Sequence, residues 1–264
     1  MKGMHIWYTM QCRHCGIKGV LRRKNGDGAP CAEERRRDMA LNIVTKTDDR
    51  VAVRHVLMSV SDKRGLEAFV PELVKSCPGV KIYSTGGTYT KVKEILGDKA
   101  AETLVAVSDY TGQPEMQGGL VKTLDFKIYL GLLSETYNDA HQSDLKRLSA
   151  VPIDMVVVNL YPFRETVAKE GVTPEMARTN IDIGGPCMVR ASAKNYLRVA
   201  SVTDPLDYPA IAAELAAHGG TVGFDTRFRL MKKAFAHTAA YDTAISGFFA
   251  SCAWEDVSRT YETL

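Results

Sequence analysis

The sequence lacks any apolar run of the length that a membrane-spanning helix needs. Such a helix takes roughly 20 consecutive apolar residues, and the 264-residue chain contains no run that approaches this. Residues 1–10 also lack the continuous apolar segment that marks a secretory signal peptide. We therefore expect a protein that does not associate with membranes, and a cytoplasmic location.

Closely spaced cysteines and a strong net charge are missing as well. Among six cysteines, only Cys12 and Cys15 are near neighbours, a pattern that fits reduced thiols better than a disulfide framework. The formal net charge is +3, which is small for this length, so nucleic-acid binding by the whole molecule is not expected. The proportions of 45% hydrophobic and 25% charged residues indicate a globular protein with a sizeable core.

The N-terminal fifty residues differ in composition from the rest of the chain. They carry the basic clusters Arg22–Lys24 and Arg35–Arg37 and no apolar run of strand length. We interpret residues 1–50 as a basic, partly disordered extension and residues 51–264 as a domain. Cys12, Cys15 and Cys31 are weak candidate zinc ligands, since a structural zinc site usually takes four ligands and a second Cys-x-x-Cys pair is absent. A flexible basic tail is the alternative, and no metal site is expected elsewhere.

From Arg54 onward, segments of strand and helix character alternate. Within Ile153–Asn159, three consecutive valines form a β-branched run without polar alternation, which is typical of a strand buried on both faces of a parallel sheet. We expect further strands at 56–60, 80–83, 103–107, 127–133 and 199–202, and helices at 66–74, 88–96, 140–148, 208–217 and 226–249. This order predicts an α/β fold, a doubly wound, mostly parallel sheet with helices on both faces.

Two loops at predicted strand ends have the composition of phosphate-binding loops. Ser59–Lys63 and Ser84–Thr88 each fall where a strand ends and a helix begins. In an open parallel sheet, ligands bind outside the carboxyl ends of the strands, where helix N-termini present N–H groups to anions. For either loop alone, a helix cap and a turn would be the better explanation, with Ser61 and Asp62 as the caps. Two such loops at neighbouring strand ends favour a phosphate site.

A third loop carries a lysine and a threonine after a diglycine. In Gly118–Leu124, Lys122 and Thr123 are placed to hold a phosphate or polarise a carbonyl. A solvated surface lysine is an equally good interpretation, because most lysines are exposed.

The last group of candidates follows the predicted strand at 153–159. Asn159 and Tyr161 are two residues apart and project to the same side. Asp182 precedes Gly184–Pro186, where a helix is expected to begin. Lys194 lies on that helix, and we expect it to reach back toward the strand ends beside Asp182, where burial and the pairing would tune both pKa values. The alternative is a structural Asp–Lys or Asp–Arg bridge with Tyr161 in the core.

Together these segments resemble the inosine monophosphate (IMP) cyclohydrolase domain of the bifunctional purine-biosynthesis protein that also carries an AICAR formyltransferase. The matching stretches follow the family's order over residues 54–250 and are Ser59–Lys63, Ser84–Thr88, Ser108–Gly112, Pro114–Met116, Val121–Leu124, Asn159–Phe163, Ile181–Gly185, Ala193–Asn195 and Lys233–Asp242. The resemblance implies a methylglyoxal-synthase-like fold and a homodimer.

The resemblance also implies a reaction, the dehydrative ring closure of 5-formamidoimidazole-4-carboxamide ribonucleotide to IMP. Such chemistry needs a base, an acid and a donor aimed at the developing oxyanion, and it requires no metal or redox cofactor. Matched by position, Lys194 and Asp182 would transfer protons, while Lys122 and Tyr161 would position the substrate or stabilise charge. The implied substrate-binding residues are Ser61, Asp62, Lys63, Thr85, Gly86, Gly87, Thr88, Thr123, Asn159, Ile183 and Gly184, of which Asn159 and Ile183 would contact the base.

The chain departs from the family pattern next to Lys122. Where the family usually reads Gly-Arg-Val-Lys-Thr-Leu-His-Pro, this chain has Leu120 for the arginine and Asp125 for the histidine. The loss of a cation leaves nucleotide affinity and substrate identity open. The chain also stops where the formyltransferase half would start, so a separate formyltransferase is expected to supply the substrate.

A non-catalytic module of the same fold, which senses a nucleotide or phosphate, is the alternative to an enzyme. The joint presence of Lys122, Tyr161, Asp182 and Lys194 favours catalysis, because a sensor would need only the phosphate loops.

Overall fold

The computed structural model describes residues 8–11, 18–21, 43–114 and 122–262. The chain separates into two compact units, Met1–Thr45 and Lys46–Leu264. In the first unit, strands β1 (Tyr8–Gln11) and β2 (Lys18–Leu21) pair antiparallel, with Tyr8 opposite Leu21. The weak zinc candidates Cys12, Cys15 and Cys31 lie outside the described residues.

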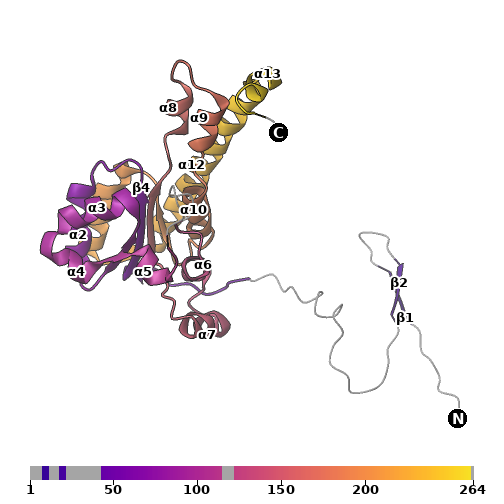
Figure 1. Ribbon diagram of the computed structural model, residues 1–264. Coiled ribbons are helices and arrows are strands. Elements are labelled where there is room, and N and C mark those ends of the chain that lie inside the picture. Colours follow the sequence, from indigo (N-terminus) through magenta and orange to yellow (C-terminus); the bar gives the residue numbers. More distant parts are fainter. Residues whose placement is uncertain (1–7, 12–17, 22–42, 115–121, 263–264) are drawn as a thin grey trace, which may run out of the picture. The chain divides into compact units, whose positions relative to one another are not determined.

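The second unit is built on a five-stranded sheet with the order β6-β5-β4-β7-β8, in which every neighbouring pair is parallel (Figure 1). The strands are β4 (His55–Val60), β5 (Lys81–Ser84), β6 (Leu104–Ala106), β7 (Met155–Asn159) and β8 (Ala200–Val202). The doubly wound α/β fold predicted from the sequence is therefore confirmed. The chain first builds outward from β4 to β6 and then returns to add β7 and β8 on the other side of β4. This reversal makes the carboxyl ends of β4 and β7 the topological switch point, where such sheets bind ligands.

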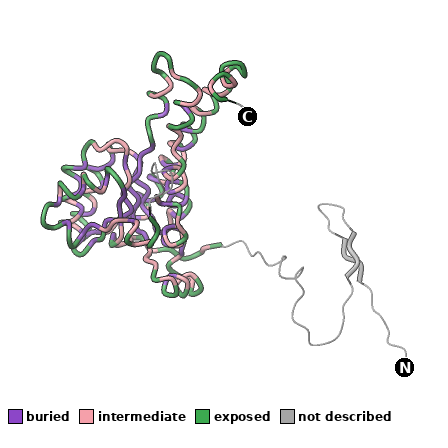
Figure 2. Tube along the Cα trace, in the orientation of Figure 1, coloured by how far each residue is buried: buried purple, intermediate pink, exposed green. Residues whose placement is uncertain are grey.

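The sheet is covered on both faces, as the valine run in β7 predicts. All five residues of β7 are buried. Met155 and Val157 pack into one apolar core with α2 (Leu66–Ser76) and α11 (Tyr208–Ala217), while Val156 and Val158 pack into a second core with α10 (Gly184–Lys194). Figure 2 shows the buried residues concentrated in the strands, with the outer faces of the helices exposed. The alternation of side chains along each strand thus supplies both cores.

The helices connect the strands and lie on both sides of the sheet (Figure 1). Their bounds are α2 (Leu66–Ser76), α3 (Gly86–Leu96), α4 (Ala100–Thr103), α5 (Val107–Thr111), α6 (Phe126–Leu133), α7 (Asp139–Arg147), α8 (Phe163–Val167), α9 (Pro174–Thr179), α10 (Gly184–Lys194), α11 (Tyr208–Ala217), α12 (Phe224–Ser251) and α13 (Trp254–Ser258), with 3-10 turns at Gly97–Lys99 and Pro205–Asp207. Among the described residues, no helix combines the length and apolarity needed to span a membrane.

Two local expectations are wrong. The apolar run at 127–133 is the helix α6, not a strand, because Asp125 caps it by accepting a 2.7 Å hydrogen bond from the N–H of Lys127. A short apolar run does not distinguish the two structures by itself. Ser61 and Asp62 do not cap α2, whose N-cap is Gly65 in the left-handed region at φ 78°. The Asp62 carboxylate instead binds Arg64.

A second, two-stranded sheet joins the start of this unit to its end. β3 (Arg50–Ala52) pairs antiparallel with β9 (Thr221–Gly223). Arg227, at the start of α12, is fully buried and donates to the carbonyl oxygens of Val222 and Asp48 and, at 3.1 Å, of Leu197. These bonds fix the first turns of α12 against the sheet. The later part of α12 lies with α8, α9 and α13, beyond the sheet (Figure 1).

Candidate active site

A cavity of about 330 Å³ opens at the carboxyl ends of β4, β5 and β7. Most of the sequence-predicted site residues line it, although they come from five separate segments. They are Ser61, Lys63, Thr85, Gly86, Gly87, Thr88, Lys122, Thr123, Asn159, Tyr161, Asp182, Ile183 and Gly184. The topology gathers them because each of these segments follows a strand or begins a helix at the same edge of the sheet.

One side of this cavity is the N-terminus of α3. The N-cap Thr85 makes no side-chain capping bond, and the first turn contains no acidic residue. The first N–H groups of a helix have no acceptor within it and carry a partial positive charge. Gly86 has φ 49°, a conformation that glycine adopts without strain.

Two lysines approach the same helix end. The Nζ of Lys122 lies 2.9 Å from the point that a Cβ on Gly86 would occupy, and the Nζ of Lys63 lies 3.8 Å from the corresponding point on Gly87. Within the described residues, the Lys63 ammonium makes only long bonds, of 3.5 and 3.4 Å, to the carbonyl oxygens of Val60 and Ser61. Two cations and a helix N-terminus around two glycines form a site suited to a phosphate group.

The hydroxyl of Thr88 has a structural role instead of the phosphate contact expected for it. Its Oγ1 donates to the carbonyl oxygen of Val60 and accepts from the N–H of the same residue, both at 3.0 Å. The side chain is buried. Thr88 therefore ties the end of β4 to α3, and only its backbone N–H belongs to the anion site.

Asn159 likewise fixes the loop after β4. Its Oδ1 accepts from the N–H groups of Ser61 and Asp62 at 2.7 and 2.8 Å, and its Nδ2 donates to the Asp62 carbonyl at 2.9 Å. The base contact expected for Asn159 is therefore not what its amide does in this structure. Asp62 does not line the cavity, and its hydrogen bonds with Arg64 hold the pKa of its carboxyl below the ordinary value.

Asp182 lines the same cavity as the phosphate-type loop and comes just before α10. Its Oδ1 accepts a 2.8 Å hydrogen bond from the N–H of Gly185. Burial raises the pKa of this carboxyl above its ordinary value, while hydrogen bonds from the backbone of Gly185 and Tyr161 partly oppose that shift. Among the described residues, no lysine or arginine forms an ion pair with Asp182, so the alternative of a structural bridge is not found there. A desolvated carboxylate beside a cavity has the environment of a general base.

Tyr161 borders the cavity and is not a core residue. Its side chain is 48% exposed, which removes the alternative that placed it in the interior. Ile183, next to Asp182, is 56% exposed on the same cavity. An aromatic ring and an aliphatic side chain at the mouth of a polar cavity can flank a flat heterocycle.

Lys194 is not at the cavity. It is the last residue of α10, whose first residue, Gly184, lines the cavity. Ten residues at 1.5 Å each separate the two ends by about 15 Å along the axis. The Lys194 side chain is exposed, and its neighbour Asn195 binds the carbonyls of Leu132 and Ser134. The expectation that Lys194 reaches back to Asp182 does not hold within one chain.

The departures from the family pattern fall partly outside the described residues. Leu120 lies within 115–121, which are not described. Asp125 is described and caps α6, so its carboxylate is used in the fold. In the described part of the chain, no group of three or more His, Cys, Asp and Glu side chains is arranged to hold a metal ion.

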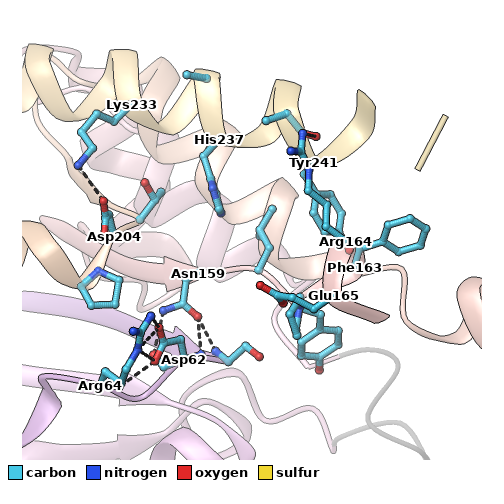
Figure 3. Close-up of a pocket in the computed structure, with 18 residues that line it drawn as sticks. Asp62, Arg64, Asn159, Phe163, Arg164, Glu165, Asp204, Lys233, His237 and Tyr241 are labelled. Carbon is cyan, nitrogen blue, oxygen red and sulfur yellow. Dashed lines mark hydrogen bonds and ion pairs between the residues drawn. The ribbon is translucent and has the colours of Figure 1, made fainter. Parts of the chain in front are cut away.

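A second, larger cavity of about 800 Å³ adjoins the first and shares Ser61, Asn159 and Tyr161 with it (Figure 3). Four of its charged groups form ion pairs, Arg64 with Asp62 and Lys233 with Asp204. Lys233, His237 and Tyr241 lie four residues apart on the face of α12 that lines this cavity (Figure 3). Burial lowers the pKa of His237.

Tyr241 was not among the sequence-predicted site residues, although its hydroxyl accepts a 2.7 Å hydrogen bond from the N–H of Asp182. The spacing of four along α12 indicated a shared face. The spacing did not indicate that this face of α12 would contact the link between α9 and α10, where Asp182 lies.

Comparisons with known proteins agree with the geometry. A family model described as "MGS-like domain" matches residues 65–187, and one described as "AICARFT/IMPCHase bienzyme" matches residues 192–263. The bifunctional purine biosynthesis protein PurH of Neisseria gonorrhoeae (strain NCCP11945) is 49% identical over 199 residues, which are 75% of this chain and 36% of that protein. PurH of Neisseria meningitidis serogroup A is 47% identical over 211 residues, 80% of this chain and 38% of that protein.

The chain therefore spans little more than a third of the length of these curated relatives. A solved structure, "Crystal structure of ForH", superposes with a TM-score of 0.65 at 30% identity and covers 75% of this chain and 97% of that one.

Proposed function

The chain belongs to the AICARFT/IMPCHase bienzyme family and contains its MGS-like domain, and we propose that it is an IMP cyclohydrolase of purine biosynthesis. The substrate we propose is 5-formamidoimidazole-4-carboxamide ribonucleotide, which loses water as it closes to IMP. The observation that carries this proposal is one cavity lined by both a phosphate-type site and the desolvated carboxylate of Asp182.

The phosphate group of the nucleotide is assigned to the N-terminus of α3. There the first-turn N–H groups, Lys63 and Lys122 supply donors and positive charge around Gly86 and Gly87. Binding energy gained at this remote group holds the reacting end of the substrate in place. The heterocycle then lies toward Tyr161 and Ile183.

Ring closure requires proton transfer at two nitrogens. The carboxamide nitrogen attacks the formyl carbon and gives up a proton, which we assign to Asp182 as the general base. The formyl oxygen gains charge as the new N–C bond forms, and the Tyr161 hydroxyl is our candidate donor to it. The formamido nitrogen loses its proton as the ring C=N bond forms, and the former formyl oxygen departs as water. The two protons of that water thus come from the two nitrogens.

The raised pKa of Asp182 suits this role. A carboxylate that is poorly solvated is a stronger base than one in water, provided that it is ionised at the working pH. The hydrogen bond from Gly185 keeps the carboxylate in one orientation.

Further parts of the proposal come from the family alone. We propose a homodimer in the cytoplasm. Sedimentation analysis of the purified chain tests the homodimer, with a monomer at micromolar concentration as the contradicting result.

The direct test of the function is to mix the purified chain with the formamido ribonucleotide and follow IMP formation by absorbance. The matched control is the amino ribonucleotide without the formyl group, which has no carbon for the ring closure and should give no product. Binding of the formamido ribonucleotide without turnover would instead support a nucleotide-sensing module.

A further inference from the structure

The backbone of Asp182 is hydrogen-bonded to Tyr241 of α12, a residue outside the segments that carry the proposed chemistry. The hydroxyl oxygen of Tyr241 accepts a 2.7 Å hydrogen bond from the N–H of Asp182, and the hydroxyl faces the carbonyl oxygen of Asn180 at 3.4 Å. One side chain therefore contacts two residues of the four-residue link between α9 and α10. We propose that Tyr241 is a positioning residue that sets the location and orientation of the Asp182 carboxylate, an inference that rests on the proposed function.

The Tyr241 side chain is itself rigidly placed. It is 8% exposed, and its ring packs edge-on against Phe163, with 6.2 Å between the ring centroids. Burial raises the pKa of its hydroxyl, so the group stays protonated at neutral pH. It can then accept from Asp182 and donate to Asn180 at the same time.

The Asp182 residue is consequently fixed at two points. Tyr241 holds its backbone N–H, and the N–H of Gly185 holds its carboxylate. Loss of the first contact frees the backbone of the link and weakens the second contact. Because the Gly185 bond lowers the pKa of Asp182 against the effect of burial, its weakening should raise that pKa further. A small displacement of a proton-transfer group lowers kcat steeply.

The substitution Tyr241→Phe removes the hydroxyl and keeps the ring. Tyr110→Phe is the matched control, because the Tyr110 hydroxyl accepts a 2.9 Å hydrogen bond from the N–H of Val151 and Tyr110 does not line the cavity. Tyr110→Phe loses one tyrosine-to-backbone bond, and Tyr241→Phe loses one of 2.7 Å and a weaker one of 3.4 Å, so their stability losses should be comparable. The pH dependence of kcat separates positioning from stability.

For Tyr241→Phe we expect kcat to fall about 10-fold, KM to stay within about twofold, and the acid limb of the pH profile to move upward. Tyr110→Phe should retain the wild-type kcat and profile. A Tyr241→Phe variant with wild-type kcat and an unshifted acid limb would overturn the proposal, as would an equal loss in Tyr110→Phe.

A second measurement keeps this test independent of the proposed function. The Asp182 carboxyl is titrated by NMR on protein with ¹³C-labelled aspartate, and the Asp182→Asn variant assigns its signal. Tyr241→Phe should shift the midpoint upward while Tyr110→Phe leaves it in place, whether or not the wild type closes the ring. An unchanged midpoint in Tyr241→Phe overturns the inference, whereas failure of the ring-closure assay alone overturns only the proposed function.

Discussion

Gly185 donates its backbone N–H to the Asp182 carboxylate at 2.8 Å, and only the absence of a side chain at Gly185 leaves room for that carboxylate. A Cβ at this position would overlap Oδ2 of Asp182 and lie 2.7 Å from Cδ2 of Leu160. The added methyl group would therefore clash with both Asp182 and Leu160. The glycine is thus part of the proposed catalytic geometry, although it has no side chain to react.

The first prediction concerns Gly185→Ala. We expect kcat to fall on the order of 100-fold, since the added methyl group displaces the carboxylate from its hydrogen bond. KM should change much less, because the phosphate site at α3 is untouched. Steady-state kinetics measure both. Gly247→Ala is the control, as a helical glycine with nothing within 4 Å of its virtual Cβ, and it should leave kcat unchanged. Equal activity of the two variants would contradict the role given to Gly185.

The second prediction concerns the pH dependence of stability. The folded-state pKa of Asp182 lies above the ordinary value of 3.8, so the folded chain binds this proton more tightly than the unfolded chain. Its ionised form therefore lowers stability at neutral pH, and that cost diminishes as the pH falls through the raised pKa. Asp182→Asn should be more stable than the wild type at neutral pH and lose this advantage near pH 4. Urea unfolding at both values measures the difference, and a variant less stable at neutral pH would contradict the raised pKa.

Some features of the fold and the site could be predicted from the sequence, and others could not. The valine run of β7 and the helical spacing of α11 and α12 are local patterns, and they were sufficient for the doubly wound fold. Loop composition together with the strand-end rule was sufficient to bring Lys63, Gly86 and Asp182 to one cavity. Both inferences needed only periodicity and topology.

Other features depended on long-range contacts that periodicity does not encode. Lys194 was expected at the site because of its helix, but rise along the axis places it about 15 Å from Gly184. The hydrogen bonds of Thr88 and Asn159 with the end of β4 and the loop after it, and that of Tyr241 with Asp182, join segments far apart in sequence. The helix α6 begins at a cap formed by Asp125. The prediction rested on the apolar run at 127–133 and did not take this capping residue into account.

The third prediction concerns the phosphate site. Lys63→Ala should raise KM about 10-fold with kcat less affected, because the lost charge acts on a remote group of the substrate. Added salt should raise the wild-type KM and have a smaller effect on the variant. Lys75→Ala is the control, since Lys75 is exposed at the far end of α2 and pairs with Glu72. A normal KM in Lys63→Ala would place the phosphate elsewhere.

The fourth prediction concerns Lys194. Because its exposed side chain lies at the opposite end of α10 from the cavity, Lys194→Ala should keep kcat within about threefold of the wild type. The assay is the ring closure at saturating substrate. Loss of turnover by two orders of magnitude, with unchanged stability, would show that Lys194 acts at a site, and would require a second copy of the chain to bring it there.

The central claim, that Asp182 is the proton-transferring group of a ring-closing site, is tested most directly by comparing wild type and Asp182→Asn in single-turnover conversion of the formamido ribonucleotide. We expect a loss of at least about 100-fold in the chemical step, with IMP binding within a few-fold of the wild type, because the α3 phosphate site remains. An Asp182→Asn variant that closes the ring at the wild-type rate would contradict it.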